Sequence, residues 1–450
     1  MWSYNKIKKT FLDYFINHDH FLCKPSSLIP ENDPSLLFTN AGMVQFKDIF
    51  MGKKEPEHIL ATNSQKCIRA GGKHNDLDDV GSDSYHHTFF EMLGTWSFNY
   101  DESNLGKSYF KEKAIDLTWD LLINVYGLDK SKMYVTYYEG NPELEIPPDY
   151  VVRDIWKKYL PNSRILAFGK DNFWQVDDIG NCGPSTEIHY DIIGNREVPE
   201  LVNKDDPTLI EIWNMVFMQY YLGKNGLIKL PKKHVDTGMG LERITAILQG
   251  CTNYQIDIFK HIIQIIEDVV DGPKYQDMYY KDDIGGVNMA YRVLADHART
   301  SIVVINDGVT PNNVGRGYVL RRIIRRAIIN GRKFNAPVGF FSKIVGNIME
   351  FMVDEYPELS DNEENIIEIV EIEEAKFNKT INKGINYFNK LLKKYGTNIS
   401  TSDLFVLYTR DGFPIDIIKY FCVENGIYFD VDKYNELMKE HIRKSKKFEK

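Results

Sequence analysis

The sequence predicts an α+β fold in its first half and a mainly helical fold in its second half. Up to Gly250, helical periodicity is mixed with short strand-like runs that clusters of Gly, Pro and Asn separate. After Gly250 the sequence changes to long segments of 3.6-residue periodicity. A chain of 450 residues is long enough for two or three packed units. We therefore expect one domain over residues 1–250 and a second over residues 251–450.

The elements follow in order along the chain. Residues 1–15 alternate Lys with aromatic residues and include Asp13, which indicates a first helix and not a targeting segment. Strands are expected at residues 61–69, 86–92, 133–138, 188–193 and 210–218, and helices at 254–270, 290–305, 318–329 and 363–394. An acidic stretch at 357–364 precedes the last of these helices, which is expected to be a solvated surface helix or part of a helical hairpin.

The composition is that of a soluble folded protein, with 43% hydrophobic and 26% charged residues and no apolar run near the 20 or so residues that cross a bilayer. No membrane partner is expected. The five cysteines are scattered, odd in number and never spaced as C-x-x-C, which argues against a disulfide framework and a thiolate zinc site. A reducing compartment, most simply the cytoplasm, is expected.

The net charge of −9 argues against a polyanionic partner. The distribution of the charged residues along the chain, however, leaves room for such a partner. Residues 299–333 contain eight basic residues and one acid, a local balance of +7. On a helical wheel, four arginines share one arc opposite an apolar arc: Arg321, Arg322, Arg325 and Arg326. This arc is either a nucleic-acid footprint or the face of an ordinary surface helix.

A long antiparallel hairpin is expected from the strand-like runs 61–69 and 86–92, which a polar loop connects. It would bring Arg69 beside His87 and Phe90. A guanidinium can bind a phosphate and an aromatic ring can stack on a base, so this trio suits a nucleotide. The alternative is a hairpin with a solvated arginine and two core aromatics.

A second group of residues surrounds the sequence DTGMGLER at 236–243. Gly238 and Gly240 let backbone approach a ligand closely, and a helix that carries Arg243 is expected to follow. The alternative is a simple helix start with Asp236 as the N-cap. Upstream, Asn214 is the single amide in an apolar strand and needs partners, and a small amino acid's ammonium would satisfy both Asn214 and Asp236.

A third group consists of Trp174 and the polar strand-like residues 182–191. Trp174 could form the wall of a small pocket, or it could be a core tryptophan with its N–H satisfied.

Together these motifs resemble a known family. The strings CIRAGGKHND (67–76) and HHTFFEMLG (86–94) resemble motif 2 of the class II aminoacyl-tRNA synthetases in its alanine-specific form. DTGMGLER (236–243) resembles motif 3, and PSLLFTNAGMVQFKD (34–48) is similar to the motif 1 region. The similarity continues through DHART (296–300) and RGYVLRRIIRR (316–326) and covers nearly the whole chain. It implies a class II antiparallel-sheet catalytic domain flanked by helices, followed by a mainly α-helical tRNA-recognition domain.

The resemblance implies ATP-dependent attachment of L-alanine to tRNA(Ala) through an alanyl-adenylate. Arg69 would bind the α-phosphate, Phe90 and Arg243 would sandwich the adenine, and Asn214 and Asp236 would hold the alanine ammonium. Arg69, Asp236 and Arg243 are therefore the implied catalytic residues. The ATP pocket would also be lined by His87, Trp174, Ile212, Trp213, Asn214 and Gly240, and Trp174 would contact alanine as well. Mg²⁺ is expected on the phosphates of ATP and not in a protein cage.

The same resemblance implies that the arginine arc meets the tRNA acceptor stem, with Asn313 reading the identity base pair from the minor groove. The family's partner for this amide is an Asp in the string L-Y-D-x-x-G. Here the string is LYTRDG, so that Thr409 stands in its place and Asp411 follows two residues later. Either side chain could take over the reading.

Several expectations complete this interpretation. None of the eleven histidines has the H-x-x-x-H spacing of the family's editing zinc site, so the chain is expected to lack the editing domain, and editing is expected beyond Lys450 or in trans. A monomer is the working expectation. The rival interpretations are an inactive paralogue that only binds tRNA and an editing-type hydrolase. The presence of Arg69, Asn214, Asp236 and Arg243 argues against the first, and the missing zinc string argues against the second.

Overall fold

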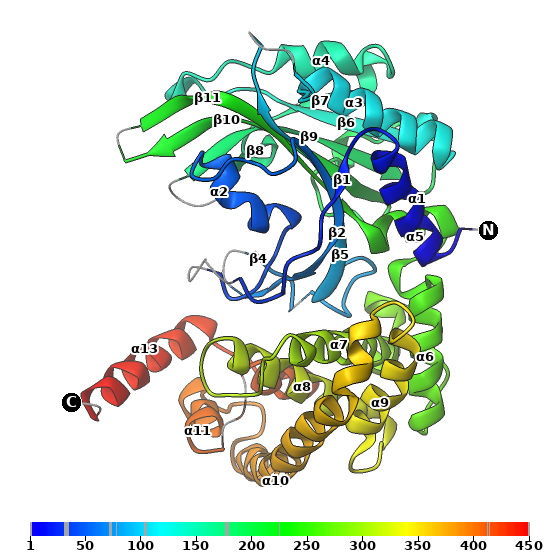
Figure 1. The fold of residues 1–450 in the computed structure, drawn as a ribbon. Coiled ribbons are helices and arrows are strands. Elements are labelled where there is room, and N and C mark those ends of the chain that lie inside the picture. Colours follow the sequence, from blue (N-terminus) through cyan, green and yellow to red (C-terminus); the bar gives the residue numbers. More distant parts are fainter. Residues whose placement is uncertain are drawn as a thin grey trace. The chain divides into compact units, whose positions relative to one another are not determined.

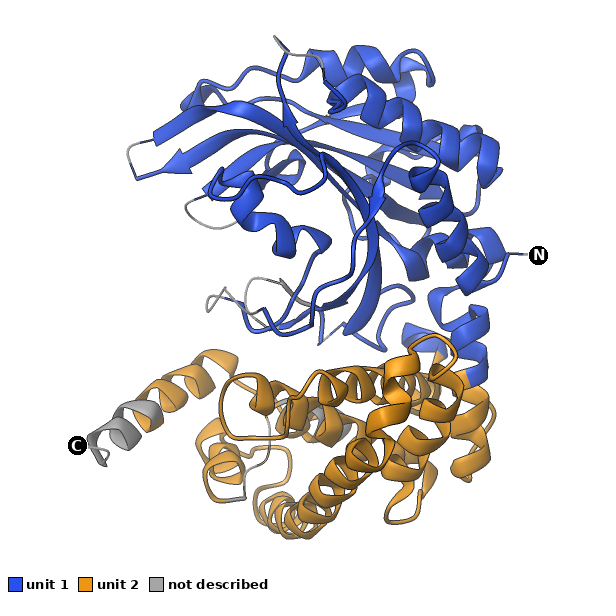
Figure 2. Cartoon of the chain, viewed as in Figure 1, with its two compact units in different colours: residues 1–261, 277–282 blue, residues 262–276, 283–450 orange. Residues whose placement is uncertain are grey.

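The computed structural model describes residues 2–30, 36–71, 74–77, 79–102, 106–175, 180–224, 226–411, 413 and 415–448. The chain divides into two compact units (Figure 2). Unit 1 comprises residues 1–261 and 277–282, and unit 2 comprises residues 262–276 and 283–450. The break falls inside a helix that begins at Asp257, a few residues after the change in sequence pattern at Gly250.

Among the described residues, unit 1 is built on a nine-stranded sheet in the order β1-β2-β5-β11-β10-β9-β6-β7, with β8 paired to β9. All pairs are antiparallel except β1 with β2 and β6 with β7. The strands are β1 (Phe21–Leu22), β2 (Leu60–Ile68), β5 (Phe89–Tyr100), β6 (Met133–Tyr138), β7 (Ile165–Phe168), β8 (Phe173–Gln175), β9 (Gly180–Asp191), β10 (Leu209–Gly223) and β11 (Gly226–Gly240); the short β3 (Ala70–Gly71) and β4 (His74–Asn75) form a separate pair.

Helices cover both faces of this sheet (Figure 1). One face carries α1 and α3, because Trp213 of β10 packs on Phe11 of α1 and Met215 accepts a hydrogen bond from Thr118 of α3. On the other face, Phe46 and Phe50 pack with Val216 in one core cluster. The helices of unit 1 are α1 (Tyr4–Ile16), α2 (Lys47–Phe50), α3 (Lys111–Asp120), α4 (Tyr150–Trp156) and α5 (Leu241–Gln249).

Unit 2 contains helices and no strand among its described residues, and it packs around α7, which is buried along most of its length. Its helices are α6 (Asp257–Val269, which begins in unit 1), α7 (Val287–Asn306), α8 (Gly315–Gly331), α9 (Phe340–Met352), α10 (Glu363–Tyr395), α11 (Thr401–Asp411), α12 (Ile415–Glu424) and α13 (Val431–Phe448). The long charged helix α10 buries a stripe that includes Ile366, Val370, Phe377 and Ile381 and exposes much of the rest. The predicted α+β half followed by a helical half is confirmed.

One predicted strand begins later than expected. β5 starts at Phe89, so that His86 and His87 precede it. The Asp83 carboxylate accepts hydrogen bonds from the backbone N–H groups of Tyr85 and His86, at 3.1 and 2.9 Å. This local bonding replaces strand pairing there, because an Asp side chain offers backbone N–H groups an alternative to the ladder.

Candidate active site

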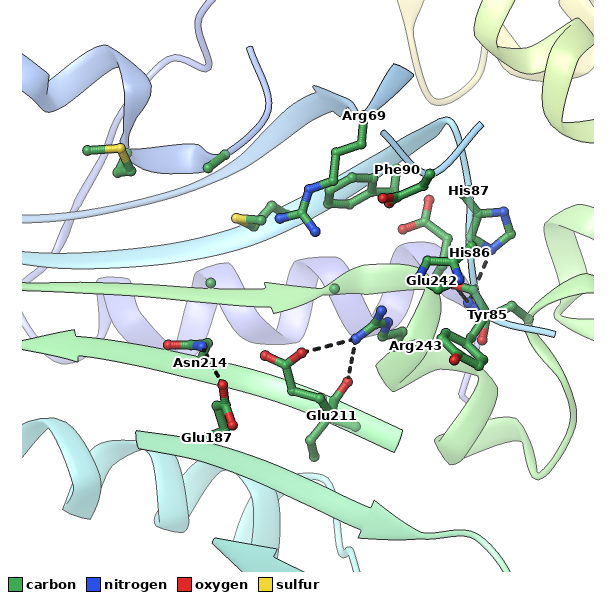
Figure 3. A pocket seen from close by; sticks show the side chains of 18 of the residues that line it. Arg69, Tyr85, His86, His87, Phe90, Glu187, Glu211, Asn214, Glu242 and Arg243 are labelled. Carbon is green, nitrogen blue, oxygen red and sulfur yellow. Dashed lines mark hydrogen bonds and ion pairs between the residues drawn. The ribbon is translucent and has the colours of Figure 1, made fainter. Parts of the chain in front are cut away.

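Unit 1 contains a cavity of about 290 Å³ on the face of the sheet opposite α1 and α3. Its lining comes from the ends of β2 and β5, from β8 to β11, and from α5. Residues from all three predicted groups meet in it, including Asp236 and Trp174. Figure 3 shows Arg69, His87, Phe90, Asn214 and Arg243 around the pocket. Side chains more than 150 positions apart in sequence therefore share one site.

Arg69 and Phe90 form one wall of this pocket. Antiparallel pairing places Cys67 opposite Phe90, and the guanidinium carbon of Arg69 lies 5.0 Å from the centroid of the Phe90 ring. The Arg69 Nε donates to the carbonyl of Asn40 at a long 3.4 Å. The hairpin prediction therefore holds for this pair, and the planar guanidinium is held by stacking.

Arg243 lies across the pocket from Phe90 (Figure 3). It belongs to the first turn of α5, whose N-cap is Gly240. Its guanidinium donates to the backbone carbonyl of Glu211 at 2.9 Å, lies 3.4 Å from the Glu211 carboxylate and stacks over Tyr85 at 5.4 Å. A ring and a guanidinium that line the same pocket offer two surfaces on which a planar heterocycle can stack.

His87 lines the pocket from a more buried position. Its ring stacks on Phe259 at 4.8 Å between centroids, and its Nε2 lies 3.1 Å from the Asn253 amide nitrogen. His87 therefore forms a fixed wall of the pocket.

At the other end of the pocket, Asn214 and Asp236 lie on the adjacent strands β10 and β11. The Asn214 amide nitrogen donates to Glu187 at 3.3 Å, while its Oδ1 is buried without a hydrogen-bond partner among the described residues. Asp236 accepts a hydrogen bond from the Trp96 indole at 2.6 Å. Burial raises the pKa of Asp236 to about 7, although the Trp96 hydrogen bond lowers it. Two oxygen acceptors, the Asn214 amide oxygen and the Asp236 carboxylate, thus line this part of the pocket.

The alternatives for this end are also decided. Asp236 is not an N-cap, because it lies inside β11 and the cap of α5 is Gly240. Trp174 lines the pocket, as the first alternative predicted, and its partly buried ring also packs against the core cluster. Gly238 lies close to the side chain of Met92, because a Cβ there would lie 2.7 Å from the Met92 sulfur and this flexible side chain would have to move.

The side chain of Trp213 does not line the pocket, which corrects the expectation for this residue. Successive residues of a strand point to opposite faces. Ile212 and Asn214 face the pocket, whereas Trp213 is 0% exposed and packs on Phe11 and Phe15 of α1.

The sequence missed several residues that line the pocket or support it. Glu211 lines the pocket together with Ile212 because the register against β9 shifts between Glu211 and Trp213. Such a bulge leaves no mark in the sequence pattern. Glu242 accepts hydrogen bonds from the backbone N–H of Glu91 and the hydroxyl of Tyr4, both at 3.1 Å, and so ties β5 to α5 behind Phe90 and Arg243. The polar density of residues 182–191 was the one signal that could have singled out Glu187.

The predicted RNA-binding residues lie in unit 2. The arginines among them make more hydrogen bonds and ion pairs within the protein than expected. Arg325 donates to the buried carboxylate of Glu373 on α10 at 2.8 Å, and Arg321 lies 3.4 Å from the same carboxylate and also donates to Asn313. Arg326 donates to His297 at 3.0 Å. Arg321, Arg322, Arg325 and Arg326 are all partly buried. The arc is therefore not simply a phosphate-facing surface, since Arg321 and Arg325 hold α8 to α10.

Asn313 and Thr409 are exposed, and the Thr409 hydroxyl donates to the carbonyl of Phe405 on its own helix at 3.3 Å. The side chain of Asp411 lies outside the described residues.

Within the described residues, no group of three or more His, Cys, Asp or Glu side chains is arranged to hold a metal ion. None of the described helices is both long and apolar enough to cross a bilayer.

A mostly antiparallel sheet that carries an arginine, an aromatic ring and a second arginine around one pocket is the arrangement expected of a class II synthetase. The sequence profile of the tRNA synthetases class II (A) matches residues 6–450, and the chain belongs to this family.

Within this family, the chain is similar to several proteins named as alanine–tRNA ligases. The chain is 49% identical to "Alanine--tRNA ligase, cytoplasmic" of Dictyostelium discoideum, over 96% of the chain and 46% of that protein. It is 46% identical to "Alanine--tRNA ligase" of Schizosaccharomyces pombe, over 95% of the chain and 46% of the relative. It is 44% identical to "Alanine--tRNA ligase, mitochondrial" of Saccharomyces cerevisiae, over 99% and 46%. The chain thus spans about half the length of these relatives.

Proposed function

We propose that this chain activates L-alanine with ATP to form alanyl-adenylate and then transfers the alanyl group to the acceptor stem of tRNA(Ala). One observation carries the proposal. A single pocket has a guanidinium and two stacking surfaces at one end, and at the other end an amide oxygen without a partner next to a carboxylate. The relatives named as alanine–tRNA ligases support the choice of amino acid.

At the nucleotide end, the adenine lies between Phe90 and Arg243, and Arg69 binds the α-phosphate. Gly240 and Ile212 allow the backbone and a small apolar surface to reach the nucleotide, and His87 closes the wall beside it. A guanidinium binds phosphate through a planar fork of donors, so Arg69 also balances the charge that develops at the α-phosphorus.

At the amino-acid end, the ammonium of alanine donates to Asn214 and Asp236 and lies below Trp174. This contact directs the alanine carboxylate toward the α-phosphorus, because a bound ammonium fixes the orientation of the rest of a small molecule. An alanine carboxylate oxygen then forms a bond to the α-phosphorus while the bond to the β-phosphate oxygen breaks, and pyrophosphate leaves. No protein nucleophile takes part.

Mg²⁺ accompanies ATP in this proposal and neutralises charge on its phosphates. The donor set fits a metal that the nucleotide carries, since Glu211 offers the pocket a carboxylate that is 37% exposed. Phosphate oxygens and water would complete the octahedral shell that Mg²⁺ prefers.

For the second step, we assign contacts with the acceptor stem to unit 2. Arg322 and Arg326 would bind the sugar-phosphate backbone of the tRNA. Arg321 and Arg325 would join them with the N–H groups that Glu373 does not use. Asn313 would read the identity pair, with Thr409 or Asp411 as its partner. Hydrolytic editing is left out of the proposal, because no histidine pair has the spacing of the editing zinc site.

We also propose a cytoplasmic location and a monomeric chain. The cytoplasmic name of one relative and the five free cysteines support the location, while the mitochondrial name of another makes it worth testing. Imaging of a tagged chain in its host cell tests the compartment, and light scattering tests the oligomeric state.

ATP–pyrophosphate exchange tests the activation step without tRNA. Exchange should be greatest with alanine, lower with glycine and serine, and absent with larger amino acids. Asp236→Ala should abolish alanine-dependent exchange while circular dichroism stays unchanged. Folded wild-type protein that supports no exchange with any amino acid would instead favour a chain that only binds tRNA.

A further inference from the structure

Glu187 also lines the pocket, and neither the motifs nor the proposed reaction gives this carboxylate a role. It belongs to β9 and pairs directly with Asn214 of β10. Only 6% of Glu187 is exposed. A buried carboxylate is costly unless hydrogen-bond donors surround it, so its partners indicate what it does.

The two oxygens of Glu187 have different surroundings. Oε1 accepts a hydrogen bond from the Asn214 amide nitrogen at 3.3 Å. Oε2 lies 3.0 Å from the amide nitrogen of Asn203, 3.3 Å from Nε2 of His189 and 3.4 Å from the hydroxyl of Thr136. One oxygen therefore faces several possible donors, and the other faces Asn214.

This arrangement decides which end of the Asn214 amide the pocket receives. Burial raises the pKa of Glu187, while its contacts with His189 and Asn203 lower it and favour the ionised form. In that form the carboxylate has no hydrogen to donate, so it requires the NH₂ end of a neighbouring amide. With NH₂ turned toward Glu187, the Oδ1 of Asn214 is left buried and without a hydrogen-bond partner among the described residues. That oxygen is the end of the amide that remains for a ligand (Figure 3).

We propose that Glu187 is a positioning residue that locks the Asn214 amide with its oxygen toward the amino-acid ammonium. The inference rests on the proposed function. A flipped amide would present two N–H donors to a cation, replacing a charge-assisted hydrogen bond by repulsion. Glu187 acts on the substrate only through Asn214.

Glu187→Gln tests this role with almost no change in shape. The glutamine oxygen should take the Oε2 side, where the Asn203 amide donates, and its NH₂ should then face Asn214 and force that amide to flip. In ATP–pyrophosphate exchange, the KM for alanine should rise at least about tenfold, the loss expected for one charge-assisted hydrogen bond. The KM for ATP should change less than about twofold, since the nucleotide end is untouched.

Asn203→Ala is the matched control. It removes another partner of the same carboxylate but leaves the contact between Glu187 and Asn214 intact, so the KM for alanine should change less than about threefold. A general loosening of β9 would instead raise the KM values for alanine and ATP together in both variants, and that result would overturn the inference.

A double-mutant cycle separates orientation from other effects. In an Asn214→Ala background no amide remains to be oriented, so Glu187→Gln should add nothing to the KM for alanine. An equal rise in both backgrounds would overturn the positioning role. If Glu187→Gln does not fold, the same cycle with Glu187→Asp applies the same criterion. Absence of alanine-dependent exchange in the wild type would overturn the proposed function as well, whereas an unchanged KM in Glu187→Gln would overturn this inference alone.

Discussion

The pocket of unit 1 and the arginine helix α8 of unit 2 contrast in how their polar groups are used. In the pocket, Asn214 keeps an amide oxygen without a hydrogen-bond partner, and 24% of the Arg243 side chain remains exposed. On α8, Arg321 and Arg325 share the carboxylate of Glu373, which is 3% exposed. The pocket thus keeps polar groups available for a ligand, whereas two of the arginines of α8 are used in ion pairs that stabilise unit 2.

The contrast shows where sequence motifs are informative. A side chain on a strand faces one side or the other, so strand spacing alone places Arg69 beside Phe90 and Ile212 beside Asn214 on the pocket face. The use of a helical arginine depends on a partner elsewhere in the chain. Glu373 lies 48 residues after Arg325, and nothing near α8 in the sequence announces it.

Replacing Arg243 should give the largest effect on the pocket side of the comparison. Arg243→Ala removes one face of the proposed adenine sandwich, and we expect kcat/KM for ATP in pyrophosphate exchange to fall about 10²–10³-fold, the equivalent of roughly 3–4 kcal/mol. Stability should change little, because the side chain is partly exposed. Arg153→Ala is the control, since this arginine also stacks on a tyrosine ring, at 4.2 Å, but lies outside the pocket. Equal losses of kcat/KM for ATP in the two variants would show that the position of Arg243 in the pocket has no special effect.

On the α8 side, the expected effect is on stability and not on activation. Glu373→Ala leaves two partly buried guanidinium groups without their carboxylate and should destabilise unit 2 by about 3 kcal/mol. Hydrogen exchange should show lower protection in α8 and α10 and unchanged protection in the sheet of unit 1. The exposed Glu371 on the same helix provides a matched control, Glu371→Ala. Equal protection in both variants would mean that the arginines do not depend on Glu373.

The pH dependence of alanine use sharpens the account of the pocket. Asp236 attracts an ammonium only when ionised, and burial raises its pKa to about 7. Its ionised fraction, and with it kcat/KM for alanine, should therefore fall about tenfold between pH 8 and pH 6. Alanine keeps its ammonium at both values. A profile for alanine that is flat across this range would show that Asp236 does not titrate there.

The smallest expected effect concerns RNA binding by α8. Arg322→Ala should weaken tRNA binding only modestly and reduce the slope of log K against log salt by about one phosphate contact, or roughly 0.7–0.9. Lys390→Ala, on the exposed side of α10, controls for loss of one positive charge. An unchanged slope for Arg322→Ala would leave the arginine arc with a purely structural role.

Much of the fold could be predicted because its elements are regular. The run 133–138 coincides with β6, and the expected helix 363–394 falls within α10, since alternation and 3.6-residue periodicity are local signals. The late start of β5 could not be predicted, because it depends on how the Asp83 side chain bonds the following backbone. The bulge that turns Glu211 into the pocket depends on register between strands.

The candidate site was predictable to a similar degree. Individual motifs left alternatives open, such as Asp236 as an N-cap, and only the sheet brings Asp236 and Asn214 onto adjacent strands, two positions apart in register. The roles of Glu187 and Glu242 could not be predicted, although Glu242 lies within the DTGMGLER string and Glu187 within the polar run 182–191, because these roles depend on the donors that surround each carboxylate.

Calorimetry with two non-hydrolysable ligands tests directly whether Asn214 and Asp236 recognise an ammonium, because it measures the affinity of the protein for each ligand. One is the sulfamoyl analogue of alanyl-adenylate, and the other is its counterpart without the amino group. The wild type should bind the amino form about 100-fold more tightly, as expected for charge-assisted hydrogen bonds to a buried carboxylate and amide. Asp236→Asn should lose most of that difference. Equal affinity of the wild type for both ligands would contradict the account.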